Sequence, residues 1–173
     1  MVSINDIKNY LKVKLSKKRY IHTLNILELS VRLAAHNGIK EIEKIKIAAL
    51  LHDCKKDIGN GNNHSFLAYN LAKKKFKIKD IKILNAIKNH TYGHRNMDDF
   101  SKIIYIADMS EPSRKFKEAK QIRRLAFKDL DKAMFLAVAT KIKYVLKEMK
   151  PISMECIILY NKLLKRQGIE NSV

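Results

Sequence analysis

The chain has 173 residues, a length that predicts one domain with a core large enough to fold without disulfides. It carries 36 Lys and Arg residues against 17 Asp and Glu, so its formal net charge is +19. Two cysteines, Cys54 and Cys156, are too few for a disulfide scaffold, and no stretch approaches the ~18 apolar residues of a transmembrane helix. The sequence therefore predicts a soluble, cytoplasmic protein that has no secretory signal and does not act at a membrane.

The positive charge comes mainly from lysine, since only seven of the 36 basic residues are arginines. Proteins that read bases or phosphates through paired hydrogen bonds favour arginine. We therefore interpret the charge as solvated lysine faces rather than a nucleic-acid surface. Its field still attracts small polyanionic molecules.

Apolar residues recur at helical spacing, and 5 Gly and 2 Pro provide few breaks. In chain order, the predicted helices cover about residues 3–17, 18–36, 40–56, 64–76, 80–90 and 98–110, followed by amphipathic helices within about 115–147 and 152–167. Ser3 and Asp6 form a capping-box pattern at the start of the first predicted helix. Pro112 follows the end of the sixth predicted helix. The clearest loop is Gly59–Asn63. The sequence therefore predicts an all-α fold of about eight or nine helices in one domain over residues 1–173.

A His-Asp pair, His52-Asp53, follows the apolar run Ile47–Leu51. A carboxylate at the end of a buried run is costly to desolvate unless a cation or several donors meet it. Adjacent helix positions point about 100° apart, so both side chains can bind one ion only if it lies between them. By itself the dipeptide is a weak signal, and a solvent-facing polar pair at a helix end is the alternative.

Two further residues of the same chemistry lie on apolar helix faces. Asp108 ends the run Ile103–Ala107, where it needs either a metal ion or a buried lysine as its partner. His22 shares one helix face with Ile26 and Leu29, a position equally typical of a hydrogen-bonded core histidine. Mixed His and Asp ligands suit a divalent transition metal such as iron, manganese, cobalt, nickel or zinc.

Two histidines lie at predicted helix boundaries. His64 opens the fourth helix and His90 closes the fifth, just before Thr91. Either can bind a second ion, contact a phosphate, or be an ordinary helix-end residue. His36, at the C-terminal end of the second helix, is interpreted as structural because its charge is favourable there.

In this order the residues resemble the HD-domain superfamily of metal-dependent phosphohydrolases. The resemblance to the YqeK family is closer; it covers roughly residues 18–125 and depends on four sequence motifs. These are Arg19-Tyr20-Ile21-His22-Thr23, Leu51-His52-Asp53-Cys54-Lys55-Lys56-Asp57, Asn89-His90-Thr91-Tyr92-Gly93, and Ile104-Tyr105-Ile106-Ala107-Asp108 followed by Glu111-Pro112-Ser113-Arg114. Two positions depart from the family pattern: His94 precedes Arg95 where an arginine is expected directly, and Cys54 replaces an aliphatic or aromatic residue.

The resemblance implies a compact HD-domain bundle with the motifs in its core, and C-terminal helices over about 126–167. It implies an iron-preferring site of one or two ions, and hydrolysis of diadenosine tetraphosphate into two ADP. The implied metal ligands are His22, His52, Asp53 and Asp108, with Asp53 also catalytic, and His64 and His90 bind a second ion or a phosphate. The implied substrate contacts are Arg19, Lys56, Asp57, Thr91 and Arg114.

Two other functions stay open at the level of sequence. One is an HD phosphohydrolase for a different mono-, tri- or cyclic nucleotide. The other is a basic binding module without catalytic activity, against which the intact ligand residues argue. A homodimer through the C-terminal helices is also compatible with the sequence.

Overall fold

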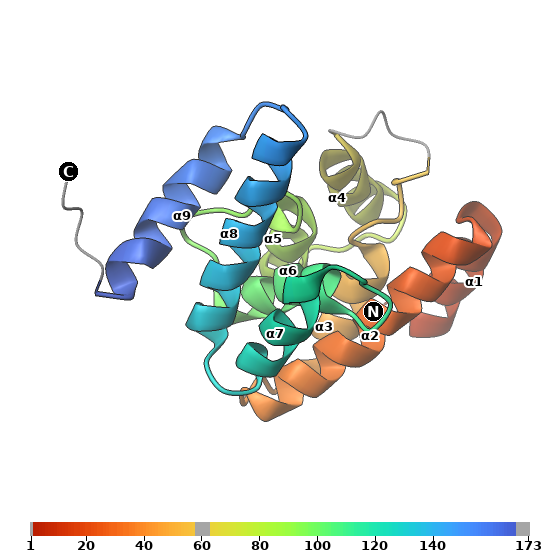
Figure 1. The fold of residues 1–173 in the computed structure, drawn as a ribbon. Helices are drawn as coiled ribbons and strands as arrows, with labels where there is room; N and C mark the ends of the chain where they lie inside the picture. The colour runs from red at the N-terminus through yellow and green to blue at the C-terminus, as the bar shows by residue number, and fades with distance from the viewer. Residues whose placement is uncertain (1, 58–62, 169–173) are drawn as a thin grey trace.

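The computed structural model describes residues 2–57 and 63–168. Within these residues it contains nine α-helices and no strand, which confirms the predicted all-α class (Figure 1). The helices are α1 (Ile4–Lys14), α2 (Lys17–His36), α3 (Ile42–Leu51), α4 (His64–Lys74), α5 (Ile81–Asn89), α6 (Asp99–Ser110), α7 (Lys117–Ala126), α8 (Leu130–Lys147) and α9 (Met154–Arg166).

Helix α6 lies at the centre of the molecule. It contacts α2, α3, α5, α7 and α8, and its run from Ile103 to Ala107 is fully buried. Helix α3 is buried in the same way along Ile47–Leu51. A buried Leu or Ile side chain contributes about 1.5–3 kcal/mol, so these two apolar runs account for much of the core. The polar residues that directly follow them are consequently held inside the protein.

Helix α3 is shorter than the sequence predicted. It ends at Leu51, and His52–Asp57 form consecutive turns in place of the expected last helical turns. The Cys54 amide donates to the Leu51 carbonyl (3.3 Å) and the Lys56 amide to the Asp53 carbonyl (2.9 Å). These bonds span three residues rather than four, so the chain turns more tightly and Asp53 and Lys56 face the same space. No Gly or Pro marks this change.

The segment predicted as amphipathic over 115–147 is two helices, α7 and α8. Asp129 begins α8 by accepting a hydrogen bond from the Lys132 amide at 2.9 Å, as an N-cap residue does. Of the predicted loop Gly59–Asn63, residues 59–62 lie outside the described residues, and Asn63 precedes α4.

The C-terminal helices continue the bundle. Helix α8 contacts α6 and α7, and α9 lies beside α8 at the end of the molecule opposite α1 (Figure 1). In the described part of the chain, no helix combines the length and apolar character needed to cross a bilayer. The homodimer stays a prediction.

Candidate metal centre

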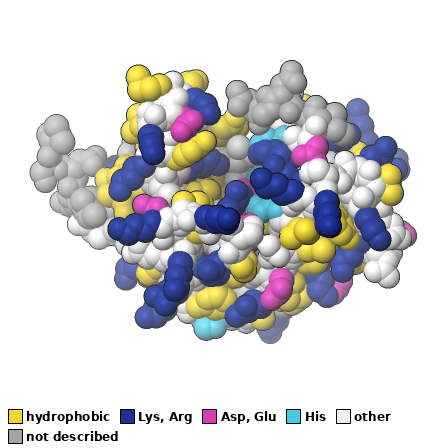
Figure 2. All heavy atoms as spheres, turned by 45° about the vertical axis from the view of Figure 1, so that its right-hand side comes forward, with side chains coloured by type: hydrophobic (Ala, Val, Ile, Leu, Met, Phe, Trp, Pro, Cys, Tyr) yellow, Lys and Arg dark blue, Asp and Glu magenta, His cyan; other side chains and the backbone are white. Residues whose placement is uncertain are grey.

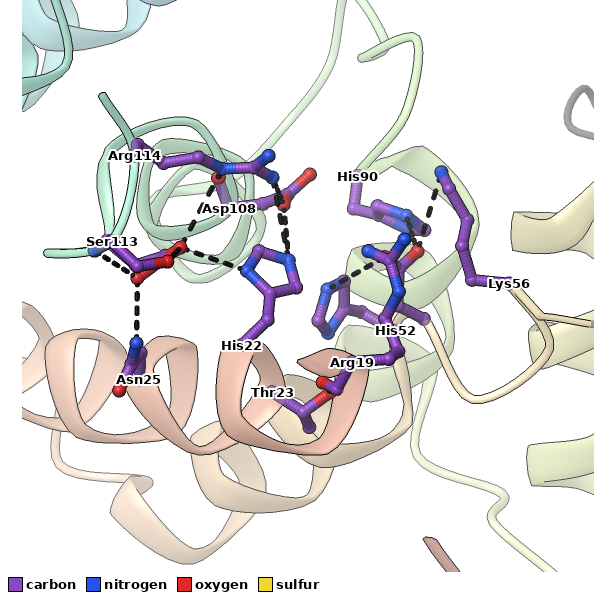
Figure 3. Close-up of polar contacts among 12 residues, drawn as sticks. Arg19, His22, Thr23, Asn25, His52, Lys56, His90, Asp108, Ser113 and Arg114 are labelled. Atoms are coloured by element: carbon purple, nitrogen blue, oxygen red, sulfur yellow. Dashed lines mark hydrogen bonds and ion pairs between the residues drawn. The ribbon is translucent and has the colours of Figure 1, made fainter. Parts of the chain in front are cut away.

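Side chains from five separate segments meet in the protein interior, and Figure 3 shows His22, His52, His90 and Asp108 among them. We call them the His/Asp cluster, and its members are His22 from α2, His52 and Asp53 from the turn after α3, His64 from the start of α4, His90 just after α5, and Asp108 from α6. The four histidines and Asp53 are buried, and the Asp108 side chain is 16% exposed. The structure thus brings together all six residues that the sequence singled out for metal binding.

His52 has one ring nitrogen that bonds a backbone carbonyl and one that hydrogen-bonds no described residue. Its Nδ1 donates to the Ala49 carbonyl at 2.7 Å, which leaves Nε2 as the acceptor in the neutral ring. Among the described residues, Nε2 of His52 is buried without a hydrogen-bond partner. Burial lowers the pKa of His52 to about 4, so the ring is neutral at physiological pH. A neutral, buried and unpartnered imidazole nitrogen fits a metal ligand.

Asp53 lies between two groups of nitrogen donors. Its Oδ1 is 3.1 Å from His90 Nε2 and 3.3 Å from His64 Nε2. Its Oδ2 is 3.1 Å from Arg19 Nη1 and 3.8 Å from His52 Nε2. Burial alone would raise the pKa of Asp53, but the nearby His52 and His90 outweigh burial and hold this pKa below its usual range. The carboxylate therefore stays charged and can serve both groups of donors.

Asp108 and His22 form the other side of the cluster. His22 Nε2 lies 3.2 Å from Asp108 Oδ1, and Arg114 Nη2 lies 2.5 Å from the same oxygen. Burial favours a higher pKa for Asp108, but the hydrogen bond to His22 and the charge of Arg114 hold it well below its ordinary value. His22 Nδ1 contacts Glu111 Oε1 at 3.0 Å, which sets the orientation of the ring.

The described residues contain three overlapping sets of candidate ligands, and within each set the ligand atoms lie within 4.8 Å of one another. They are His22 with His52 and Asp53, His52 with His90 and Asp108, and Asp53 with His64 and His90. Histidine nitrogens combined with carboxylate oxygens form a donor set typical of divalent transition metals. Because Asp53 belongs to the first and third sets, the geometry accommodates either one ion or a pair that shares this carboxylate.

The residues expected to contact substrate surround the cluster. Arg19 pairs with Asp53 and Arg114 with Asp108, and both arginines line one cleft. Lys56 Nζ lies 2.8 Å from His64 Nε2, and Thr91 Oγ1 lies 2.9 Å from the same nitrogen.

Protein groups also engage the carboxylate of Asp57, the remaining expected substrate contact. Its Oδ2 accepts from the Ser16 amide at 2.9 Å, and its Oδ1 lies 3.8 Å from Arg19 Nε. Asp57 therefore holds the start of α2 and the Arg19 side chain.

Two residues in contact with the cluster or its neighbours were not among the predicted site residues. Glu111 is fully buried and accepts from Asn25, Ser113 and His22. Glu111 follows Asp108 by three residues, a spacing that places two side chains on the same side of a helix and could have pointed to Glu111. Lys141 on α8 donates to the Thr91 carbonyl. No sequence pattern identifies Lys141, because α8 approaches the cluster only through the tertiary fold.

The turn after His90 depends on a glycine. Gly93 has φ +76°, and a Cβ atom there would lie 2.3 Å from Leu159 Cδ2 of α9. The positive φ therefore favours glycine at this position, and a larger residue would also require the Leu159 side chain to shift. Leu159 thus adjoins the segment that carries His90 and Thr91.

Comparisons with known proteins agree with this geometry. The HD domain family model matches residues 19–113. A symmetrical bis(5'-nucleosyl)-tetraphosphatase of Halalkalibacterium halodurans is 30% identical over 90% of this chain and 94% of its own length. The protein of the same name from Bacillus subtilis is 28% identical over 88% of this chain and 93% of its own length.

A solved structure extends the comparison to the fold. It is described as a predicted HD superfamily hydrolase involved in NAD metabolism from Clostridium acetobutylicum, and is 35% identical to this chain. The two structures superpose with a TM-score of 0.89 over 96% of this chain and 99% of the other. The chain therefore belongs to the HD-domain family, and along nearly its whole length it groups with the symmetrical bis(5'-nucleosyl)-tetraphosphatases.

Proposed function

We propose that this protein hydrolyses dinucleoside tetraphosphates, diadenosine tetraphosphate in particular, symmetrically into two ADP. The observation that carries the proposal is the 30% identity to a symmetrical tetraphosphatase over 90% of the chain, with the His/Asp cluster assembled in the core. Water attacks the phosphorus second from one adenosine, and the bond to the oxygen that bridges the two central phosphorus atoms breaks. The attacked half leaves as ADP carrying the water oxygen, and the other half leaves as ADP with the bridging oxygen.

We propose that the cluster holds a divalent metal, with iron as the preferred ion. His22, His52, Asp53 and Asp108 would hold one ion, and Asp53, His64 and His90 a second where two are bound. A bound divalent metal supplies Lewis acidity toward a phosphoryl oxygen and lowers the pKa of a bound water. The unpartnered Nε2 of His52 supports this assignment. Activity that survives complete chelation would contradict it, and anaerobic reloading with iron, manganese, cobalt, nickel or zinc ranks the metals.

The chain's own charged residues handle the substrate phosphates. Arg19 and Arg114 line the cleft from opposite sides, and Lys56 lies beside His64. Their positive charges neutralise the charge that builds on the departing ADP. Asp53, whose pKa is held low, is a poor proton acceptor. We therefore assign it the role of orienting the attacking water and binding metal.

A panel of nucleotides distinguishes this function from another HD phosphohydrolase activity. The wild-type protein should hydrolyse diadenosine tetraphosphate faster than adenosine mono- or triphosphate or a cyclic nucleotide. Asp53→Ala should abolish turnover and reduce metal content, whereas Asp6→Ala on the exposed face of α1 should retain both. Faster hydrolysis of any other nucleotide would overturn the proposed substrate, and full activity of Asp53→Ala would overturn the site.

A further inference from the structure

A cleft of about 1150 Å³ extends outward from the His/Asp cluster. It lies between the start of α2 and the segment that joins α6 to α7, and His22 and Glu111 line its inner end. Figure 2 shows histidine side chains at the surface with Lys and Arg side chains gathered around them. The volume exceeds the roughly 300–1,000 Å³ of an ordinary ligand pocket, so the cleft has room for more than the reacting phosphates.

The charge of the cleft favours an anion. Five of its lining residues are cationic, namely Lys17, Lys18, Arg19, Arg114 and Lys115, against the two carboxylates of Asp57 and Glu111. Both carboxylates are already engaged: Asp57 accepts from the Ser16 amide at 2.9 Å, and Glu111 from the Ser113 amide at 2.7 Å. Arg19 and Arg114 in turn pair with Asp53 and Asp108. The excess positive charge along the cleft therefore comes from Lys17, Lys18 and Lys115, and it matches a chain of phosphates.

The start of α2 is unusual for a helix. Its first turn contains Lys17, Lys18 and Arg19 and no acidic residue. Cations at a helix N-terminus oppose the helix dipole and destabilise the helix, whereas an anion bound there interacts favourably with both. Asp57 already places one carboxylate at this end of α2, and a bound phosphate would add a second anion beside the three cations.

Two large apolar side chains in the cleft are exposed to solvent. Ile21 is 48% exposed and Phe116 is 37% exposed, one on α2 and one just before α7. Phe116 occupies the N-cap of α7, where Ser, Thr, Asp or Asn would accept a hydrogen bond and where a phenyl ring accepts none. Helix capping therefore does not explain this residue, while an aromatic ring beside cations suits a base joined to phosphates.

We propose that this cleft binds one nucleoside of the dinucleotide, with its base against Phe116 and Ile21 and its phosphates along Arg19, Arg114 and the neighbouring lysines. The inference rests on the proposed function and adds the residues that recognise the half of the substrate outside the reacting phosphates. Phe116 is then a specificity residue that contacts substrate without taking part in the chemistry.

The test compares two substrates in metal-loaded protein. Phe116→Ala should raise KM for diadenosine tetraphosphate about tenfold, because base stacking on an aromatic side chain is lost, with little change in kcat. The same variant should hydrolyse bis(p-nitrophenyl) phosphate, which has no nucleoside, as the wild type does. Phe116→Tyr should restore KM. Tyr144→Ala removes an aromatic residue of α8 that is more exposed, at 56%, and should change the hydrolysis of neither substrate.

The outcomes separate this inference from the proposed function. An unchanged KM in Phe116→Ala, or equal losses on both substrates, would overturn the nucleoside site while the hydrolase stands. If the wild type does not hydrolyse diadenosine tetraphosphate, the proposed function fails. Calorimetric titration with ADP still tests the cleft in that case: weaker ADP binding by Phe116→Ala than by Tyr144→Ala supports it, and equal binding overturns it.

Discussion

The two carboxylate oxygens of Asp53 have different partners. One faces His64 and His90, and the other faces Arg19 and His52. One buried carboxylate thus connects both groups of donors. The residues that orient these donors, such as Glu111 behind His22 and the Ala49 carbonyl behind His52, are as much part of the site as the ligands.

Glu111→Gln should weaken metal binding or activity about 10- to 100-fold, the usual cost of changing a group that orients a metal ligand. The change keeps the size of a fully buried side chain but removes the charge that faces His22 Nδ1. Metal affinity by competition with a chelator, together with kcat, gives the result. Glu28→Gln, on the exposed face of the same α2, is the matched control. Identical metal affinity and kcat in both variants would show that Glu111 does not position His22.

Because of His52, we expect the stability of the metal-free protein to decrease at acid pH. Its pKa is about 4 in the folded state against an ordinary 6.5, so between these values the unfolded chain binds a proton that the folded protein does not. Stability therefore falls as pH decreases from about 6.5 to about 4, by roughly 3 kcal/mol from this residue. Urea unfolding in EDTA at several pH values measures the loss. The pH slope should flatten in His52→Gln and persist in His36→Gln, which changes an exposed histidine; equal slopes would refute the assignment.

At the level of elements, the cluster depends on helices that carry no ligand. The Leu159 side chain of α9 lies beside Gly93, and Lys141 of α8 donates to the Thr91 carbonyl, so both helices adjoin the turn that follows His90. Burial lowers the pKa of Lys141, which also lies over the ring of Tyr105 at 5.3 Å from its centre. The C-terminal helices therefore act on the site through this turn.

Lys141→Met should reduce kcat about 2- to 10-fold, which corresponds to the net loss of one hydrogen bond. Methionine keeps the long apolar stem but cannot donate to the Thr91 carbonyl. A positioning role further predicts weaker metal binding in a chelator titration. Lys143→Met, two residues away and exposed, controls for the lost charge. If both variants match the wild type in kcat and metal affinity, the link from α8 is structural only.

The sequence was sufficient to predict the helices and the members of the cluster, because apolar periodicity and motif order are local properties. Their apolar helix faces made His22 and Asp108 candidates, each with a structural alternative, and the resemblance to the HD-domain superfamily implied that they are metal ligands. The predicted end of α3 was wrong because His52–Asp57 contain no Gly or Pro to mark the tighter turn. Lys141 could not be found because its contact with Thr91 joins residues 50 positions apart through the tertiary fold.

At the scale of the whole molecule, the net charge of +19 creates a field that draws anions toward the protein. Lys and Arg side chains surround the opening at the histidines (Figure 2), so part of this field converges on the site. The charge therefore contributes to substrate capture over a distance and not only to direct contacts.

Raising the salt concentration should consequently increase KM for diadenosine tetraphosphate more than kcat changes. At about 0.15 M ionic strength charges are screened beyond about 8 Å, and at 1 M beyond about 3 Å. Steady-state kinetics over this range measure the effect, and bis(p-nitrophenyl) phosphate, with a single negative charge, should show a smaller increase. Equal salt dependence for the two substrates would show that the field plays no part in capture.

Symmetrical cleavage requires that water attacks one of the two central phosphorus atoms and leaves two identical nucleotides. Hydrolysis of diadenosine tetraphosphate by the metal-loaded protein in ¹⁸O-labelled water, followed by chromatography and mass spectrometry, tests it most directly. ADP should be the only nucleotide product, with one labelled oxygen in one of the two ADP molecules from each substrate. AMP together with ATP would contradict symmetrical cleavage, and absence of hydrolysis with every metal tested would contradict the assigned substrate.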